Sequence, residues 1–205
     1  FSGDMHGTEG PLAVSDQRYT HPLSKAFVRA CQEYGIPYNP DFNGPRQSGA
    51  GLYQVTNRNG RRCSAAVAYL GAARGRRNLT LRTGALVQRI LVENGRAVGV
   101  VVAERGRTRT IRAGTEVILA AGVINSPKLL MLSGIGPASA LSALGIDVAL
   151  DLPGVGRNLH DHLDVFLMYR LKGVESYDVY RKPYRQVLPG LQYAAFRTGP
   201  VSATI

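Results

Sequence analysis

Two histidines and an aspartate stand close together in the sequence NLHDH, at residues 158–162. Alternate residues of an extended segment point to the same side, so His160 and His162 offer two imidazoles of the kind that metal ions bind. No third or fourth ligand is spaced along the chain to join them. We therefore expect no metal site here and interpret the segment as a polar hinge.

A turn of very small residues is the most informative feature of the chain. It lies in EVILAAGVINSPKLLMLSGIG, residues 116–136. The apolar residues 117–119 are typical of a buried parallel strand, and residues 120–122 then let the backbone approach a flat or charged ligand. Doubly wound α/β folds bind nucleotide cofactors at such a junction of strand, turn and helix, although any α/β protein has tight turns of this kind.

The helix after this turn is predicted to have Ser126 as its N-terminal cap and Pro127 at its first position. Ser133 and Gly134 end it, and a short helix follows at 138–144.

Other reactive side chains have structural interpretations. Ser64 has no G-x-S-x-G around it and is typical of a helix start rather than a nucleophile. His6, in HGTEGPL, is expected to hold a loop. Cys31 and Cys63 lack C-x-x-C spacing, so we expect two buried thiols in a reducing cytoplasm, without a disulfide or a metal.

Four segments carry a family resemblance. AAGVINSPKLLMLSGIGP closely resembles the second signature of the glucose-methanol-choline (GMC) oxidoreductases, FAD-dependent enzymes that oxidise alcohols. HGTEGPLAVSD at 6–16, NGRRCSAAVAYL at 59–70 and DLPGVGRNLHDHL at 151–163 match the family in the same order. The resemblance covers nearly the whole chain and is closest to the choline-dehydrogenase-like bacterial branch. Val123 departs from it, because many members carry a small residue there.

The resemblance implies which residues approach the adenosine side of FAD. Val87 would contact adenine through its backbone, the alternative being a plain inward-facing strand residue. Ala121 and Gly122 would lie against the pyrophosphate and ribose, where a larger side chain would collide.

The resemblance also gives the NLHDH segment a place. Asn158, Asp161 and His162 match the family motif N-L-x-D-H, which binds no metal, and would pack beside the isoalloxazine end of FAD. His160 occupies the variable position of the motif and is incidental.

The reaction implied is oxidation of an alcohol by hydride transfer to flavin N5, while a base removes the hydroxyl proton. The family's active-site histidine belongs to a C-terminal segment that this chain lacks, and no G-x-G-x-x-G occurs in it. We therefore expect an internal piece of a longer polypeptide, with no catalytic residue of its own and little or no hold on FAD. The alternatives are an inactive fragment or binding module, and a flavin-dependent lyase or decarboxylase of the same family.

The predicted fold is a mixed α/β structure. It comprises part of a glutathione-reductase-type FAD-binding domain with a β-meander, and the beginning of an antiparallel-sheet substrate domain. The predicted domains are 1–50, which contributes to the cavity, 51–156 for FAD binding, and 157–205 for the substrate domain. Strands are predicted at 52–56, 79–83, 85–93, 97–104, 108–113, 117–119 and 164–173, and the longer helices at 22–34, 64–73 and 184–197.

Composition narrows the partners. The net charge of +11 comes largely from arginines in turns and hairpin edges, where they are ordinary solvated residues, so we expect no nucleic acid. No apolar run approaches the roughly 18 residues of a membrane span. The expected partner is a small alcohol, and the sequence sets no oligomeric state.

Overall fold

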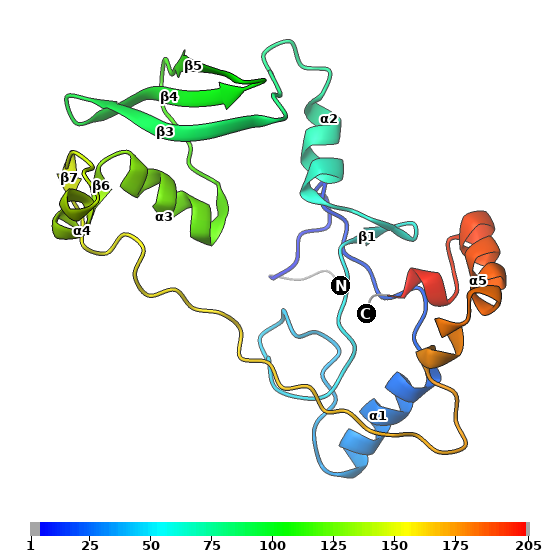
Figure 1. Cartoon of the computed structure of the whole chain (residues 1–205). Helices are drawn as coiled ribbons and strands as arrows, with labels where there is room; N and C mark the ends of the chain where they lie inside the picture. Colours follow the sequence, from blue (N-terminus) through cyan, green and yellow to red (C-terminus); the bar gives the residue numbers. More distant parts are fainter. Residues whose placement is uncertain (1–4, 204–205) are drawn as a thin grey trace. The chain divides into compact units, whose positions relative to one another are not determined.

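The computed structural model describes residues 5–203, which form two compact units. One unit runs from Thr80 to Leu167. The other joins the residues up to Leu79 to those from Met168 onward. The elements of both are drawn in Figure 1. The domain limits near residues 50 and 156 stay predictions.

An antiparallel meander forms the sheet of the first unit. Its strands are β3 (Ala85–Glu93), β4 (Arg96–Glu104) and β5 (Arg107–Arg112), in that order across the sheet. The turn residues Asn94, Gly95, Arg105 and Gly106 all have φ between 49° and 75°. Positive φ at both positions of a two-residue turn suits the twist of the strands it joins, and the predicted meander is confirmed.

Helix α3 (Gly122–Leu132) lies beside β3 (Figure 1). It begins earlier than predicted, because Ala121 rather than Ser126 holds the N-cap position and Pro127 lies inside the helix. The carbonyl that Pro127 leaves without a donor is that of Val123 in the exposed first turn, where water can bind it. The predicted end is confirmed, since Gly134 follows the helix with φ of 80°.

A small parallel pair completes this unit. β6 (Ile135–Gly136) pairs with β7 (Leu150–Asp151), and α4 (Ala138–Ala143) connects them. The Asp151 carboxylate accepts a hydrogen bond of 2.9 Å from the backbone N–H of Ala138, at the start of α4. The predicted helix at 138–144 is thereby confirmed, and Gly145 ends it with φ of 69°. The buried apolar residues of the unit are Ile90, Val101, Val102, Leu129 and Leu141.

Most of the regular structure of the second unit is helical. Its helices are α1 (Pro22–Glu33), η1 (Ala66–Leu70), α2 (Gly71–Ala73), η2 (Tyr177–Arg181), α5 (Pro183–Phe196) and η3 (Pro200–Ser202). The long helices predicted near 22 and 184 are confirmed. The helix predicted at 64–73 is present with a wide π-helical turn, and the Ser64 hydroxyl accepts a hydrogen bond from the Val67 N–H at 3.3 Å.

A hydrogen bond connects the two sequence segments that make up this unit. β1 (Asn57–Arg58) and β2 (Arg61–Arg62) form a hairpin, and the Tyr193 hydroxyl of α5 donates to the Gly60 carbonyl in its turn at 2.8 Å. The Arg197 guanidinium lies over the Tyr193 ring, 5.1 Å from its centre. Helix α5 is therefore fixed to the hairpin through one side chain.

Four predicted strands are wrong, and the reason is the same for each. Residues 79–83, 117–119 and 164–173 form no strand, and 52–56 makes only an isolated bridge, Ser15 with Val55. The residue predicted as buried at Ile118 is 80% exposed. A strand is stabilised by its neighbours, and no described strand lies beside these segments to accept their hydrogen bonds.

Candidate cofactor site

The turn before α3 is exposed and has little side-chain volume. Gly122 has φ of 88°, a conformation that residues with a Cβ rarely adopt, so the backbone alone favours glycine there. A Cβ added at Gly122 would meet no atom of the described chain within 4 Å. The first N–H groups of any α-helix lack intrahelical partners, so this opening can receive an anionic or flat group.

Ser126 supports this turn although it does not cap the helix as predicted. Its hydroxyl accepts a hydrogen bond of 3.0 Å from the Ala121 N–H. The bond closes the backbone of Ala121 against the first turn of α3. The small residues are thereby held in one conformation.

Val87 lies on an open edge. Strand β3 is at one side of the three-stranded sheet, and its pairing passes from Val87 with Val102 to Arg89 with Val101. Gln88 is the extra residue of this bulge, and its peptide groups are left out of the ladder. The Val87 side chain is half-buried. The two interpretations of Val87 are compatible, since its side chain packs inward while the strand edge stays open.

Ser133 attaches α3 to β3. Its hydroxyl oxygen accepts a hydrogen bond from the Ile90 N–H at 2.8 Å, and the hydroxyl donates to the Leu129 carbonyl at 2.5 Å. The two elements run in the same direction in Figure 1. The 11 residues of α3 are about 16 Å long, and about five residues of a strand have the same length. The start of α3 is therefore level with the start of β3, the end at which Val87 lies.

The NLHDH segment is exposed and has no regular secondary structure. Asn158 has φ of 56°, and the Asp161 carboxylate accepts a hydrogen bond of 2.8 Å from the neighbouring His162 N–H. No hydrogen bond or ion pair within residues 5–203 links Asn158, Asp161 or His162 to Val87 or to residues 120–122. These residues also belong to no group of three metal-binding side chains in the described chain. Their place beside a flavin stays a prediction.

In the other unit, His6 holds a loop as expected. Its Nε2 lies 2.6 Å from the Asp41 carboxylate, 35 positions along the chain. The hydrogen bond with His6 is the largest cause that lowers the pKa of Asp41, and the Asn43 N–H adds to it. This pair lies in the wall of an open hollow of about 960 Å³.

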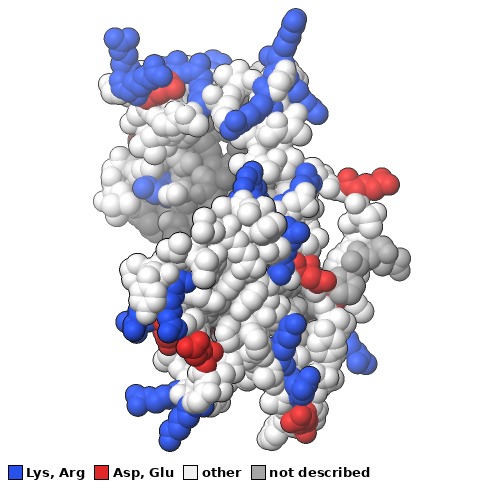
Figure 2. Space-filling model, turned by 90° about the vertical axis from the view of Figure 1, so that its right-hand side faces the viewer, with Lys and Arg blue, Asp and Glu red and all other residues white. Residues whose placement is uncertain are grey.

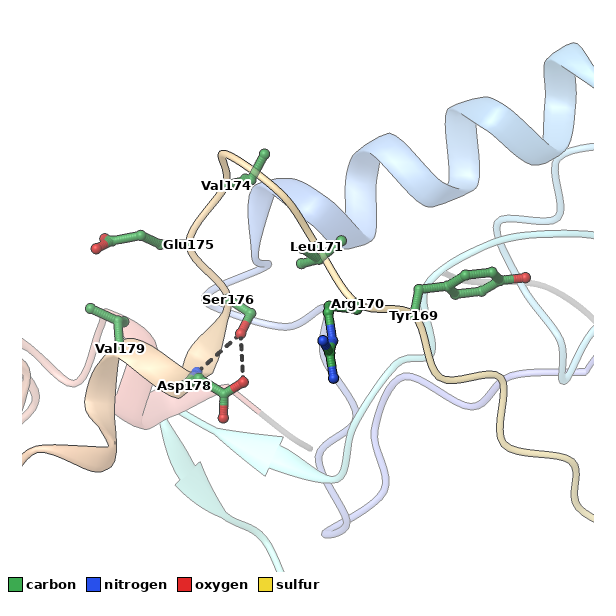
Figure 3. A pocket seen from close by; sticks show the side chains of 8 residues that line it. All are labelled: Tyr169, Arg170, Leu171, Val174, Glu175, Ser176, Asp178 and Val179. Carbon is green, nitrogen blue, oxygen red and sulfur yellow. Dashed lines mark hydrogen bonds between the residues drawn. The ribbon is translucent and has the colours of Figure 1, made fainter.

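Two smaller hollows in this unit bring the number described to three. Phe42 packs against Tyr53 with ring centres 4.7 Å apart, whereas Tyr38 lines an open hollow of about 260 Å³. Figure 3 shows a third, of about 470 Å³, where the Ser176 hydroxyl is hydrogen-bonded to the N–H and carboxylate of Asp178. The polar groups of Ser176 and Asp178 are hydrogen-bonded to each other, and the Glu175 carboxylate is paired with Arg185 at 3.3 Å.

Comparison with protein families identifies the chain. The model of the GMC oxidoreductases matches residues 3–164, well over half of the sequence. The chain belongs to the GMC oxidoreductase family. Its mixed α/β fold, with the meander beside α3, is that of the solved family members.

Curated members of the GMC family are similar over most of this chain. Human mitochondrial choline dehydrogenase is 45% identical over 193 residues, which are 94% of this chain and 32% of that protein. An alcohol dehydrogenase (acceptor) of Pseudomonas putida is 47% identical, over 80% of this chain and 30% of its own length. The chain thus spans about a third of the length of the curated relatives it matches.

A solved structure is also similar to this chain. An FAD-dependent oxidoreductase from Chaetomium thermophilum has a TM-score of 0.85 and 28% identity, over 98% of this chain and 36% of that chain.

Within residues 5–203 of this GMC chain, every helix is too short or too polar to cross a bilayer.

The sequence patterns did not indicate the residues that position the turn before α3 and the edge of β3. Ser133 was assigned only to a helix end, although a serine there can also accept from a neighbouring strand. Gln88 gave no signal, because a bulge depends on pairing rather than on residue type. Glu104, which binds both Arg82 and Arg109, has no local pattern either.

Proposed function

We propose that the protein to which this chain contributes is an FAD-dependent oxidoreductase that oxidises an alcohol, either choline-like or primary. The curated relatives are named choline dehydrogenase and alcohol dehydrogenase, and a similar solved structure is named FAD-dependent. In this proposal the chain holds part of the cofactor, and the base that accepts the substrate's proton lies outside it. We assign no catalytic role to any of its residues.

One observation carries the proposal. The exposed turn at Ala121 and Gly122 opens α3 at the same end of the unit as the free edge of β3 at Val87. The turn offers backbone N–H groups and no side-chain bulk, and the edge of β3 offers peptide groups near Val87. A dinucleotide needs both, because its phosphates are anions and its adenine has a flat edge of donors and acceptors.

The residues have distinct tasks in this arrangement. The Val87 backbone would bind adenine, and Ala121 and Gly122 would admit the ribose and pyrophosphate. Asn158, Asp161 and His162 would line the flavin end. Bound FAD would supply the hydride acceptor, and the protein would supply orientation and a site without water.

For the chain alone we propose no alcohol-oxidising activity and weak or no FAD binding. The observation that favours this is the exposure of Ile118, just before the cofactor turn. The backbone groups of a turn bind a cofactor in a defined geometry only if the strand that leads into the turn is fixed. The names of the relatives favour alcohol oxidation over a lyase or decarboxylase of the same family.

We also place the protein in the cytoplasm with a small alcohol as its partner. The Cys63 thiol is buried and close to the Ala13 N–H at 3.4 Å, and Cys31 is partly covered. Neither is in a disulfide in the described chain, which suits a reducing compartment.

The test compares a full-length protein that contains this chain with the 205 residues alone. Both are purified, given excess FAD and desalted, and their visible absorbance is recorded. Dye reduction is then followed with choline and a set of primary alcohols.

We expect bound flavin and alcohol-dependent turnover only in the full-length protein. A colourless full-length protein, or one whose flavin no alcohol reduces, contradicts the proposed function. Sustained turnover by the 205 residues contradicts the division of tasks and would direct attention to His160 and His162.

A further inference from the structure

Three asparagines of the chain are each followed by a glycine: Asn43, Asn59 and Asn94. In such a pair the backbone nitrogen of the glycine can attack the side-chain amide of the asparagine, because glycine has no Cβ to hinder the approach. The nitrogen forms a bond to Cγ, ammonia leaves, and a cyclic succinimide results. Water then opens the ring to aspartate or isoaspartate. The reaction needs no enzyme, so the fold decides which pairs react.

Two hydrogen bonds hold the backbone of the first pair, Asn43 and Gly44. The Asn43 N–H donates to the Asp41 carboxylate at 3.0 Å, and the Gly44 N–H donates to the Asp41 carbonyl at 3.3 Å. Asp41 is itself bound by His6 of another loop. The Gly44 nitrogen must therefore lose a hydrogen bond before it can attack.

The second pair, Asn59 and Gly60, is held more firmly. The Gly60 N–H donates to the Asn57 side-chain oxygen at 2.8 Å, and the Gly60 carbonyl accepts from the Tyr193 hydroxyl at 2.8 Å. Gly60 is buried, and a Cβ added to it would collide with the backbone of Arg197. The peptide between Asn59 and Gly60 can turn toward the asparagine side chain only after both bonds are broken.

The third pair, Asn94 and Gly95, has no such restraint. Both residues are exposed in the turn between β3 and β4, and a Cβ added to Gly95 would meet no atom of the described chain within 4 Å. The ladder bonds at a two-residue turn belong to the flanking residues, here Glu93 and Arg96. Within residues 5–203 the Gly95 N–H donates no hydrogen bond, so the attacking nitrogen is free.

The tip of this hairpin is also separated from the rest of its ladder. Val98 is left out of the pairing where β3 and β4 change register. Two residue pairs, Val92 with Ala97 and Glu93 with Arg96, lie between this bulge and the turn. The tip can therefore open without disturbing the remaining pairs of the sheet, and such local opening costs much less free energy than global unfolding.

Two side-chain contacts cross this tip. Glu93 pairs with Arg112 at 2.5 Å, and the Arg96 guanidinium donates to the Thr115 carbonyl at 3.0 Å. Exposed contacts of this kind contribute little to stability. Neither of them involves the Asn94 side chain or the Gly95 nitrogen, so they leave the reacting groups free.

We propose that Asn94 is a site of spontaneous deamidation in the folded protein, and that the fold protects Asn43 and Asn59. The aspartate product keeps the turn and adds a negative charge. The isoaspartate product carries the main chain through the former side chain and so gains a backbone methylene. A two-residue turn with this longer backbone cannot keep Glu93 opposite Arg96, so the end of the hairpin opens. The proposal is independent of the proposed function.

The added charge can be measured because the chain is basic. Its net charge is +11, and Lys and Arg outnumber Asp and Glu over the face drawn in Figure 2. A chain with one new carboxylate therefore elutes earlier from a cation exchanger. Peptide mapping by mass spectrometry then locates the asparagine that has become an acid.

The test incubates the 205-residue chain at neutral pH, once folded and once unfolded in urea, and follows each asparagine with time. Asn94→Gln is compared with Asn59→Gln, because glutamine cyclises much more slowly and both positions have φ near 50°, 51° and 53°. Tyr193→Phe removes the hydrogen bond to the Gly60 carbonyl. Circular dichroism verifies that all variants fold.

We expect the three asparagines to react at comparable rates in urea, since each is followed by glycine. In the folded chain Asn94 should react at least about tenfold faster than Asn43 and Asn59, the factor that one hydrogen bond of ordinary strength represents. Asn94→Gln should remove the early acidic form, and Asn59→Gln should not. Tyr193→Phe should speed the reaction at Asn59 and leave that at Asn94 unchanged.

A folded chain in which Asn43 or Asn59 reacts first, or in which all three react equally, would overturn the assignment. So would an Asn94 that stays intact while the unfolded chain is fully converted. A reaction at Asn59 that Tyr193→Phe does not speed would overturn the account of its protection. Hydrogen exchange at Val92 should be faster in the isoaspartate form than in the aspartate form, and equal exchange would overturn the opening of the turn.

Discussion

Removing the hydroxyl group of Ser133 tests how α3 is attached to β3. The Ser133→Ala change deletes the acceptor of the Ile90 N–H and the donor to the Leu129 carbonyl. Ile90 is 7% exposed, so its N–H has little access to water as a replacement. A buried donor left without a partner costs about 1–3 kcal/mol. The Leu129 carbonyl also loses the donor at the helix end, because the Ser133 N–H is bonded to the Leu130 carbonyl at 3.0 Å.

The assay is urea unfolding of the variant together with hydrogen exchange at the Ile90 amide. We expect the free energy of unfolding to fall by about 1–3 kcal/mol, and exchange at Ile90 to be at least about fivefold faster, since about 1.4 kcal/mol corresponds to a factor of ten. Ser139→Ala is the control, because Ser139 lies exposed in α4 without a side-chain hydrogen bond in the described chain. Unchanged exchange at Ile90 in Ser133→Ala would refute the attachment.

Three further changes test the second unit. Ser64→Ala should cost about 1 kcal/mol through loss of the bond to the Val67 N–H and leave the turnover of a full-length protein intact, as unfolding and dye reduction would show. Tyr193→Phe should lower the free energy of unfolding by about 0.5–1.5 kcal/mol and expose the hairpin at Gly60 to faster proteolysis. Unchanged cleavage would argue that the Tyr193–Gly60 hydrogen bond does not hold α5 to the hairpin. Asp41→Asn tests pH dependence. Because the folded pKa of Asp41 is lowered, its stabilisation is complete above the unfolded value of about 4 and is lost as the pH falls through the folded pKa. Acid titration of stability should therefore be shallower in Asp41→Asn below about pH 4, and an identical acid limb would contradict the pairing with His6.

The meander was predictable because its signals are local. Asn94 with Gly95 and Arg105 with Gly106 set the two turns, and alternating apolar residues set the strands between them. Strand β3 begins and ends where the pattern places it.

The absence of a strand at 117–119 was not predictable, since whether an apolar segment forms a strand depends on a neighbour elsewhere in the chain. Residues 164–173 fail for the same reason, and Phe166 is 82% exposed. The start of α3 was missed because the positive φ of Gly122 lets the helix begin before the residues that usually cap one.

Candidate residues were predictable from motifs, but their relations were not. The small residues of the turn and the position of Val87 follow from the sequence pattern and the family resemblance. The Ser133–Ile90 bond and the Arg82–Glu104 bond each join residues at least 22 positions apart. Only Arg109 and Glu104 are close in the sequence. Such contacts follow from strand register, which no local signal encodes.

The central claim is that the Gly122 turn receives FAD, and flavin content tests it most directly. Gly122→Val and Gly145→Val are compared in a full-length protein that contains this chain. Both glycines have positive φ, 88° and 69°, and neither has a described atom within 4 Å of an added Cβ, so the backbone strain is matched. The account predicts that Gly122→Val folds and loses its flavin absorbance, whereas Gly145→Val folds and keeps it. Wild-type flavin content in folded Gly122→Val would contradict the account.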